Sequence, residues 1–281
     1  MEQVTYTSAS QLRTPRILLN ELIGDLNATR ALGWRLFITE LRSKYRQSLL
    51  GYFWILVPPL LTAVIWIFLG RWQVLNTRTD SSLYPVFVIS GIFIWQSFVE
   101  SIDLPIQTLS ARKAVITKVK APHEAFVIAG FGGIAFNLAV RMGLLLLLII
   151  VLFPVGLHTT LLLVPFGLLA VMALGLSIGL VFTPVGLLYG DVRNALMAVT
   201  SLWFFVTPII YQIPKESRIS QFLVLNPVTP LLNTTRDWII RGEMTTESGF
   251  FVVVALSVSS LLAAWFFYRI AKPHIITRIS S

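Results

Sequence analysis

Six long apolar blocks, separated by short polar connections, dominate this sequence of 281 residues. A helix that crosses the roughly 30 Å hydrocarbon core of a bilayer needs about 20 apolar residues. The blocks that reach or approach this length are residues 49–70, 83–99, 125–153, 161–182, 195–211 and 250–268. Hydrophobic residues make up 56% of the chain and charged residues only 12%, which argues against a soluble globular protein. We therefore predict an all-α membrane protein with a six-span transmembrane domain over residues 49–268.

The net charge of +9 is distributed unevenly among the connections. If the N-terminus is cytoplasmic, fifteen Lys and Arg residues lie in cytoplasmic segments and six lie on the opposite side. Because cytoplasmic loops are enriched in Lys and Arg, both termini, including the tail 269–281, are predicted to be cytoplasmic. Anionic lipid headgroups account for basic segments beside apolar spans, so no nucleic-acid partner is expected.

Two regions outside the six blocks are too apolar to be simple solvated loops. In the leader, residues 1–48, the part from 17 to 48 mixes apolar side chains with charges, which predicts an amphipathic helix along the cytoplasmic interface. A partly ordered basic leader is the alternative. The connection 212–249 contains two apolar stretches, 219–225 and 228–240, that are too short to span. We predict that they form two re-entrant helices on the outer face.

Few kinds of chemistry are open to this chain alone. It has no cysteine, which excludes disulfides and thiolate nucleophiles. His123, His158 and His274 fall in three different connections, so no metal site is predicted. No Gly-x4-Gly-Lys-Ser/Thr phosphate loop occurs, so the chain is not expected to bind ATP in that manner. We predict neither an enzymatic activity nor a cofactor bound by this chain.

Three charged residues lie in or beside the apolar blocks. Glu100 and Asp103 have the spacing of a possible acid/base pair at the end of the second block. Solvation, or contact with the lysines of the following connection, is the favoured interpretation. Arg141 lies inside the third block, where an arginine is costly. A structural pairing or a snorkelling position is favoured there, and contact with an anionic substrate group stays open.

Aromatic and hydroxyl side chains recur at or beside one helical face of the first and fifth blocks. The residues concerned are Tyr52, Thr62, Trp66, Trp203, Phe204 and Tyr211. Aromatic rings suit the faces of sugars, while hydroxyl groups can bond to sugar hydroxyls. Tyr and Trp also gather at membrane interfaces, so the lining of a substrate channel and an interface belt are both open. In the fourth block, Gly175-x3-Gly179 permits close approach of another helix.

Three stretches together resemble the permease subunit of bacterial ABC-2-type polysaccharide exporters, the class that exports O-antigen, capsule and teichoic acid. The first is KYRQSLLGYFWILVPP at 44–59, and the second is VITKVKAPHE at 115–124. The third is YGDVR at 189–193, which leads to WFFVTPIIY at 203–211 and LNPVTPL at 225–231. The resemblance extends over about residues 39–268, and the order and spacing of the motifs carry it.

The resemblance implies a working unit of two copies of this chain and two copies of a separate nucleotide-binding ATPase, which binds ATP-Mg. It places a coupling helix, which docks on the ATPase, at about residues 103–120. The residues implied in this coupling are Asp103, Arg112, Lys113, Lys118 and Lys120. The first and fifth spans would line a conduit for a lipid-linked glycan across the bacterial inner membrane.

Two other functions are compatible with parts of this pattern. An ABC-2 exporter of a drug or small lipid would have the same architecture with a different cargo. An integral-membrane enzyme that acts on lipid-linked sugars is less compatible, because such an enzyme needs several Asp, Glu or His residues at one membrane face. The sequence shows no cluster of that kind.

Overall fold

The computed structural model describes residues 29–43, 51–71, 83–111, 123–152, 156, 158–212, 225–244, 246–247 and 249–280. Within these ranges the chain is helical and contains no strand, as the sequence predicts. The elements, in chain order, are a helix at 29–43, η2 (Gly51–Ile55), α2 (Val57–Arg71), α3 (Tyr84–Ala111), α5 (His123–Leu152), η3 (Thr159–Leu163), α6 (Val164–Leu188), α7 (Asp191–Val206), α9 (Val228–Ile240) and α10 (Phe250–Ser280).

Four of these helices are long and apolar enough to cross a membrane: α3, α5, the run from η3 through α6, and α10. Helix α2 is apolar but has only 15 residues, and α7 has 16. Both fall short of the roughly 20 residues of an ordinary span. The structure therefore confirms the helical class, and it leaves the count of six spans unconfirmed.

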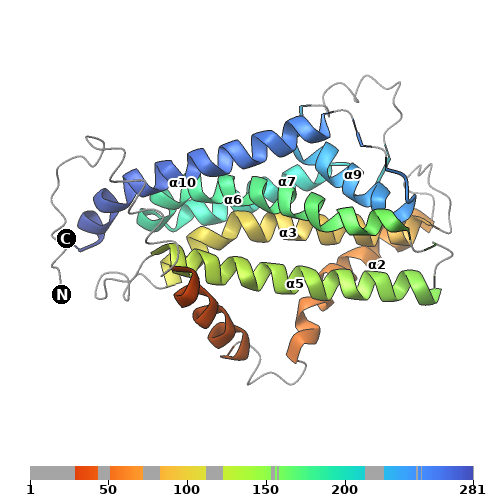
Figure 1. Cartoon of the computed structure of the whole chain (residues 1–281), viewed down its shortest axis with the longest axis horizontal. Helices are drawn as coiled ribbons and strands as arrows, with labels where there is room; N and C mark the ends of the chain where they lie inside the picture. Colours follow the sequence, from red (N-terminus) through yellow and green to blue (C-terminus); the bar gives the residue numbers. More distant parts are fainter. Residues whose placement is uncertain are drawn as a thin grey trace.

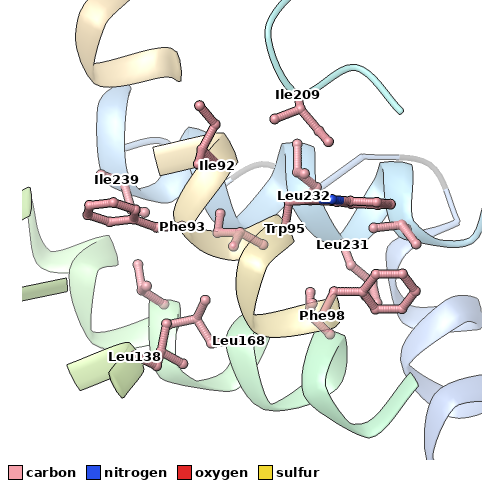
Figure 2. Packing of buried hydrophobic residues seen from close by; sticks show 14 of the residues in the cluster. Ile92, Phe93, Trp95, Phe98, Leu138, Leu168, Ile209, Leu231, Leu232 and Ile239 are labelled. Carbon is pink, nitrogen blue, oxygen red and sulfur yellow. The ribbon is translucent and has the colours of Figure 1, made fainter. Parts of the chain in front are cut away.

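Helix α3 is the centre of the bundle. It contacts α2, α5, α6, α7 and α9, whereas α10 packs mainly on α6 (Figure 1). Figure 2 shows the core around it, where Phe93, Trp95 and Phe98 of α3 lie among residues of several other elements. Those residues are Leu138 of α5, Leu168 of α6, Ile209 after α7, and Leu231, Leu232 and Ile239 of α9.

The contact between α3 and α6 depends on two glycines. A Cβ atom added to Gly175 would lie 2.6 Å from the carbonyl oxygen of Phe98. At Gly179 an added Cβ would meet the carbonyl oxygen of Ile102 and the ring of Pro105. The pair Gly175-x3-Gly179 therefore lets the backbones of two helices approach closely, which is the role predicted for it.

The boundaries of two elements correct the sequence prediction. Helix α3 continues to Ala111 instead of ending near residue 99, because Ile102, Ile106 and Leu109 remain buried against neighbouring helices. The first part of the expected coupling segment, residues 103–111, is thus the last turns of α3. Helix α7 ends at Val206 instead of residue 211, because Pro208 has no N–H group and disfavours the helical conformation at the residue before it.

The helix at 29–43 slants away from the long axis of the bundle (Figure 1). It packs on the first half of α5, where Gly33 lies against Ile128 and Phe37 lies against Gly132. The rest of the leader, residues 1–28 and 44–50, is outside the described residues. Of the two stretches predicted to be re-entrant helices, Val228–Ile240 forms the helix α9, whose re-entrant placement stays a prediction, and 219–225 lies outside the described residues apart from Leu225.

Candidate functional site: an aromatic cluster on α2, α3 and α7

The aromatic residues predicted on the first and fifth blocks meet in space. Trp66 of α2 lies 6.2 Å, between ring centroids, from both Phe204 and Phe205 of α7. Phe204 and Phe205 pack edge to face at 5.4 Å. Aromatic pairs at these distances prefer offset or edge-to-face geometry, as seen here. Trp66 and Phe204 are partly buried, and Phe205 is exposed.

Helix α3 supplies two further rings that sequence reasoning missed. Trp95 packs against Trp203 and Phe204 at 6.4 and 6.0 Å, and Phe98 packs perpendicular to Trp203 at 5.4 Å. Both α3 residues are buried. Their spacing of three residues puts them on one helical face, so the sequence itself carries this signal. We call Trp66, Trp95, Phe98, Trp203, Phe204 and Phe205 the aromatic cluster.

Three of the predicted channel residues, Tyr52, Thr62 and Tyr211, are not part of this cluster. Tyr52 belongs to η2 rather than to α2, and its ring packs on Phe136 of α5 at 5.6 Å. Tyr211 follows the end of α7, and its hydroxyl donates a hydrogen bond to the carbonyl of Phe205 at 2.8 Å. The prediction that Phe204 and Tyr211 lie along one helical face of the fifth block is therefore wrong, because α7 ends at Val206. Thr62 bonds to the carbonyl of Pro58 within α2.

The indole of Trp203 is fixed by a polar network. Its Nε1 donates to Oδ1 of Asn226 at 3.1 Å, and Nδ2 of Asn226 donates to the hydroxyl of Thr207 at 2.9 Å. The backbone N–H of Val228 also donates to Asn226 Oδ1. One buried asparagine thus joins the end of α7 to the start of α9. Sequence reasoning missed Asn226, although its position in an Asn-Pro pair before a short helix is a typical turn signal.

The segment from Thr207 to Ile210, which we call the anchored segment, is non-helical and buried. Its backbone carbonyls are bonded to side chains of other elements. Nη1 of Arg236 on α9 donates to the carbonyls of Pro208 and Ile209, each at 3.1 Å, and the hydroxyl of Tyr84 donates to that of Ile210 at 3.2 Å. Such partners are necessary because an unpaired polar group in an apolar interior is costly.

Arg236 itself is enclosed by its partners. Its side chain is buried, its guanidinium lies 3.6 Å from the centroid of the Phe87 ring, and its Nη2 donates to Oδ1 of Asn233 at 2.5 Å. Gly91 of α3 leaves room for this arrangement, since an added Cβ would lie 2.6 Å from the carbonyl oxygen of Ile209. The anchored segment is therefore held between α3 and α9.

The two carboxylates of α3 pair with arginines from other helices. Glu100 Oε1 accepts a hydrogen bond from Nη2 of Arg141 on α5 at 2.5 Å, and the Arg141 side chain is only 4% exposed. Asp103 accepts two hydrogen bonds from Arg193 of α7, at 2.6 Å from Nε and 2.7 Å from Nη2. The interpretation of these carboxylates as solvated, or as partners of loop lysines, is wrong, because α3 continues past them and neighbouring helices approach it on both sides.

These ion pairs concern two predictions from the sequence, the role of Arg141 and the role of Asp103 in coupling. Arg141 has the structural partner that was favoured for it. Asp103 is committed to Arg193, which does not test whether it also takes part in coupling. Arg112, Lys113, Lys118 and Lys120 lie outside the described residues, so their role in coupling stays a prediction.

The sequence was also compared with those of known proteins. No family model matches the chain. The chain is, however, similar over most of its length to permease and transport proteins of polysaccharide export systems. The O-antigen export system permease protein RfbA of Myxococcus xanthus is 25% identical over 256 residues, which are 86% of this chain and 93% of that protein.

Two other relatives agree with this result. The protein of the same name from Klebsiella pneumoniae is 26% identical over 216 residues, or 74% of this chain and 80% of that protein. The polysialic acid transport protein KpsM of Escherichia coli is 20% identical over 252 residues, or 86% of this chain and 94% of that protein. The names of these relatives confirm the resemblance that the motifs between residues 44 and 231 indicated.

Proposed function

We propose that this chain is the permease subunit of an exporter that moves a lipid-linked polysaccharide out across the bacterial inner membrane. The observation that carries the proposal is the similarity, over 86% of the chain, to an O-antigen export permease and to a polysialic acid transport protein. Those relatives are named as transport proteins and not as enzymes. In this proposal the chain performs no chemistry on its cargo, and a separate ATPase subunit supplies the work.

The aromatic cluster supports a path for sugars. The cluster contains aromatic rings of α2 and α7, and polar groups such as the hydroxyl of Tyr211 are close to it. The buried Trp95 and Phe98 of α3 pack against these rings. Glycan rings can pack their C–H groups on such faces, while the polar groups bond to sugar hydroxyls. Trp66, Trp203, Phe204 and Tyr211 are thus the residues we assign to the conduit. Tyr52 packs on Phe136 of α5, and the hydroxyl of Thr62 donates to the carbonyl of Pro58 within α2, so these two residues have a weaker claim.

The exposed flanks of the cluster support a conduit made from two copies of the chain. Beside the cluster, and at its exposed member Phe205, large apolar side chains are exposed on both helices, namely Leu61, Val64, Ile65 and Phe68 of α2 and Leu202 and Val206 of α7. One copy therefore exposes Phe205 and the apolar side chains that flank the partly buried rings of Trp66 and Phe204. A homodimer that brings two such surfaces face to face would close the conduit, with further apolar area left for lipid.

Coupling to the motor would take place through residues 103–120. The part that follows α3 carries Arg112, Lys113, Lys118 and Lys120, and α3 transmits its position to the cluster through Trp95 and Phe98. In this proposal both termini are cytoplasmic, and ATP-Mg binds to the partner ATPase, present in two copies. Closure of the ATPase dimer would shift these helices as rigid bodies.

The experiment that tests the proposal begins with co-purification of the chain and the nucleotide-binding subunit of its host. The pair, reconstituted in lipid nanodiscs, should hydrolyse ATP faster when lipid-linked glycan extracted from the host is added. A free glycan without its lipid is the matched control and should not stimulate. Deletion of the chain in the host should cause the lipid-linked glycan to accumulate on the cytoplasmic side. If the glycan reaches the cell surface without this chain, or if only a drug-like compound stimulates turnover, the proposal is wrong.

A further inference from the structure

Helix α2 lies against the bundle through one narrow face. Ala63 is buried on that face, and Trp66 and Ile67 are partly buried, whereas the large side chains of the opposite face are exposed. Gly70 follows Ala63 by seven residues and so lies on the same face. Because α2 packs mainly on α3, its contacts with α3 decide how far it stands from the other helices.

The last turn of α2 rests directly on the ring of Tyr84, the first residue of α3. A Cβ atom added to Gly70 would lie 2.7 Å from Cζ of that ring and 2.9 Å from its hydroxyl oxygen, and closer still to Cε1. Carbon atoms in contact lie about 3.5–4.0 Å apart, so only the hydrogen of a glycine fits here. The Tyr84 ring is thus a spacer that meets the backbone of α2 without an intervening side chain.

The spacer is itself held in place by buried partners. The Tyr84 side chain is buried, and its hydroxyl donates a hydrogen bond to the carbonyl of Ile210 at 3.2 Å. Its ring lies nearly parallel to the ring of Phe87, with an interplanar angle of 16°, and the guanidinium of Arg236 covers Phe87. Tyr84 is therefore fixed on the junction of α3, α9 and the anchored segment.

Helix α7 has a fixed place on the other side of this junction. Its residues Leu196, Met197, Trp203 and Phe204 pack on the core along its length. Only two residues separate the end of α6 from the start of α7. A change in the length of the spacer would therefore move α2, which has fewer buried residues, and would leave α7 where it is.

The distance of α2 from Tyr84 also sets the contact between the rings of α2 and α7. Trp66 lies one turn before Gly70, and its ring centroid is 6.2 Å from those of both Phe204 and Phe205. A gap of roughly 1 Å between such groups forfeits about a quarter to a half of their attraction. Small shifts of α2 would therefore separate rings that now form one surface.

We infer that Tyr84 is a positioning residue of the proposed conduit, which holds α2 at the distance that keeps Trp66 in contact with the rings of α7. The inference deepens the proposed function and rests on it, because a continuous surface of rings binds the sugars of the cargo more tightly than separated rings. Gly70 completes the arrangement, since a larger residue there would push α2 away from the spacer.

Distances between spin labels test the spacer on the purified full chain, without cargo or motor. The natural chain has no cysteine, so Val64→Cys on α2 and Leu202→Cys on α7, both exposed, provide the two labels. An excess of unlabelled chain ensures that each measured pair lies within one copy. Gly70→Ala should lengthen the mean distance by roughly 1 Å, which brings the added carbon to contact distance. The pair Leu202→Cys with Leu262→Cys, on α7 and α10, is the control and should not change.

Two variants of Tyr84 separate the spacer from the hydrogen bond. Tyr84→Phe removes the bond to Ile210 but keeps the ring, so the distance should stay that of the natural chain. Tyr84→Leu removes the ring and should shorten the distance, and Gly70→Ala with Tyr84→Leu should return it towards the natural value. A general loss of structure would not shift the distance in opposite directions. If Gly70→Ala fails to fold, Tyr84→Leu alone decides. An unchanged distance in Tyr84→Leu, or the same shift in Tyr84→Phe, would overturn the inference.

The consequence for the cargo is measured as glycan-stimulated ATP turnover of the chain with its ATPase. Gly70→Ala should raise the concentration of lipid-linked glycan needed for half-maximal stimulation by roughly two- to tenfold, the loss of one aromatic contact, and leave maximal turnover unchanged. Gly143→Ala is the matched control, since an added Cβ there meets nothing within 4 Å. An unchanged half-maximal concentration in a variant whose labels have moved would overturn the role of Tyr84 in cargo binding. If the distances shift as expected but lipid-linked glycan does not stimulate even the natural chain, the proposed function is refuted and the spacer stands.

Discussion

Glu100 of α3 and Arg141 of α5 form a partly buried ion pair, with Nη2 of the arginine 2.5 Å from Oε1 of the carboxylate; the arginine side chain is 4% exposed and that of Glu100 is 22% exposed. The second carboxylate oxygen, Oε2, is buried without a hydrogen-bond partner among the described residues. Two charges that are costly in an apolar interior therefore depend on each other. The pair ties α5 to α3 within the parts of both helices that are apolar enough to cross a membrane.

Arg141→Leu is expected to destabilise the chain, because it leaves the Glu100 carboxylate charged and without its partner. Loss of one member of such a pair costs on the order of 3 kcal/mol. The double variant Arg141→Leu with Glu100→Leu should recover most of that stability. Thermal unfolding in detergent, followed by tryptophan fluorescence, measures both effects. A single variant as stable as the natural chain would contradict this account, and a stable double variant that fails to export would show that Arg141 also meets the cargo.

Gly175→Ala is expected to lower the yield of folded protein. The new methyl group would lie 2.6 Å from the carbonyl oxygen of Phe98, which belongs to the backbone of α3 and cannot turn aside. Overpacking of this kind costs about 1–3 kcal/mol. Gly143→Ala is the matched control, since an added Cβ there meets nothing within 4 Å. The control should be neutral or stabilising by up to about 1 kcal/mol. Size-exclusion profiles of the two variants in detergent provide the comparison.

Trp66→Ala and Phe204→Ala are expected to reduce glycan export while the chain stays folded, because both rings are only partly buried. Trp95→Ala should act differently. Its ring is buried beneath the cluster, and removal of a buried tryptophan costs about 3–5 kcal/mol. The amount of glycan at the cell surface, divided by the amount of folded chain, separates a loss of export from a loss of folding. Phe251→Ala, at an exposed position of α10, is the control and should export normally. Normal export by both Trp66→Ala and Phe204→Ala would remove the cluster from the conduit.

Charge reversal of Arg112 and Lys113 to Glu is expected to separate the chain from its motor. If this basic segment docks on the ATPase, reversal should abolish glycan-stimulated ATP turnover or release the ATPase during purification, since like charges at an interface are repelled. Reversal of Arg218 and Lys215, in the connection proposed for the other side of the membrane, is the matched control. Export and assembly that survive the first reversal would place the docking site elsewhere.

The sequence predicts the helical class and the positions of most helices because their apolar blocks are long. It also predicts the bounds of α9, which prolines and an asparagine mark at its start. Two boundaries could not be obtained in this way. A hydropathy block ends at Glu100, but α3 continues because its charged residues find partners on α5 and α7. Conversely, the fifth block continues through Pro208, although the helix ends before it.

The candidate site, like the fold, could be predicted from the sequence only in part. The meeting of Trp66 with Phe204 and Phe205 agrees with two stripes that the sequence shows. The roles of Asn226 and Arg236 could not be read from the sequence, because they depend on where the backbone carbonyls after α7 come to lie. A hydrogen bond between residues 27 or 28 positions apart, such as those of Arg236, leaves no local pattern.

In both ion pairs of α3, the acid is synthesised well before the arginine that pairs with it. Glu100 precedes Arg141 by 41 residues, and Asp103 precedes Arg193 by 90. At about 5–20 residues per second, a ribosome completes the first partner roughly 2–8 s after Glu100 and the second roughly 5–18 s after Asp103. Until then, α3 carries both acids without the arginines that pair with them in the folded chain. We therefore expect α3 to reach its final position only after α5 and α7 have been made, because the arginines that pair with its two acids belong to those helices.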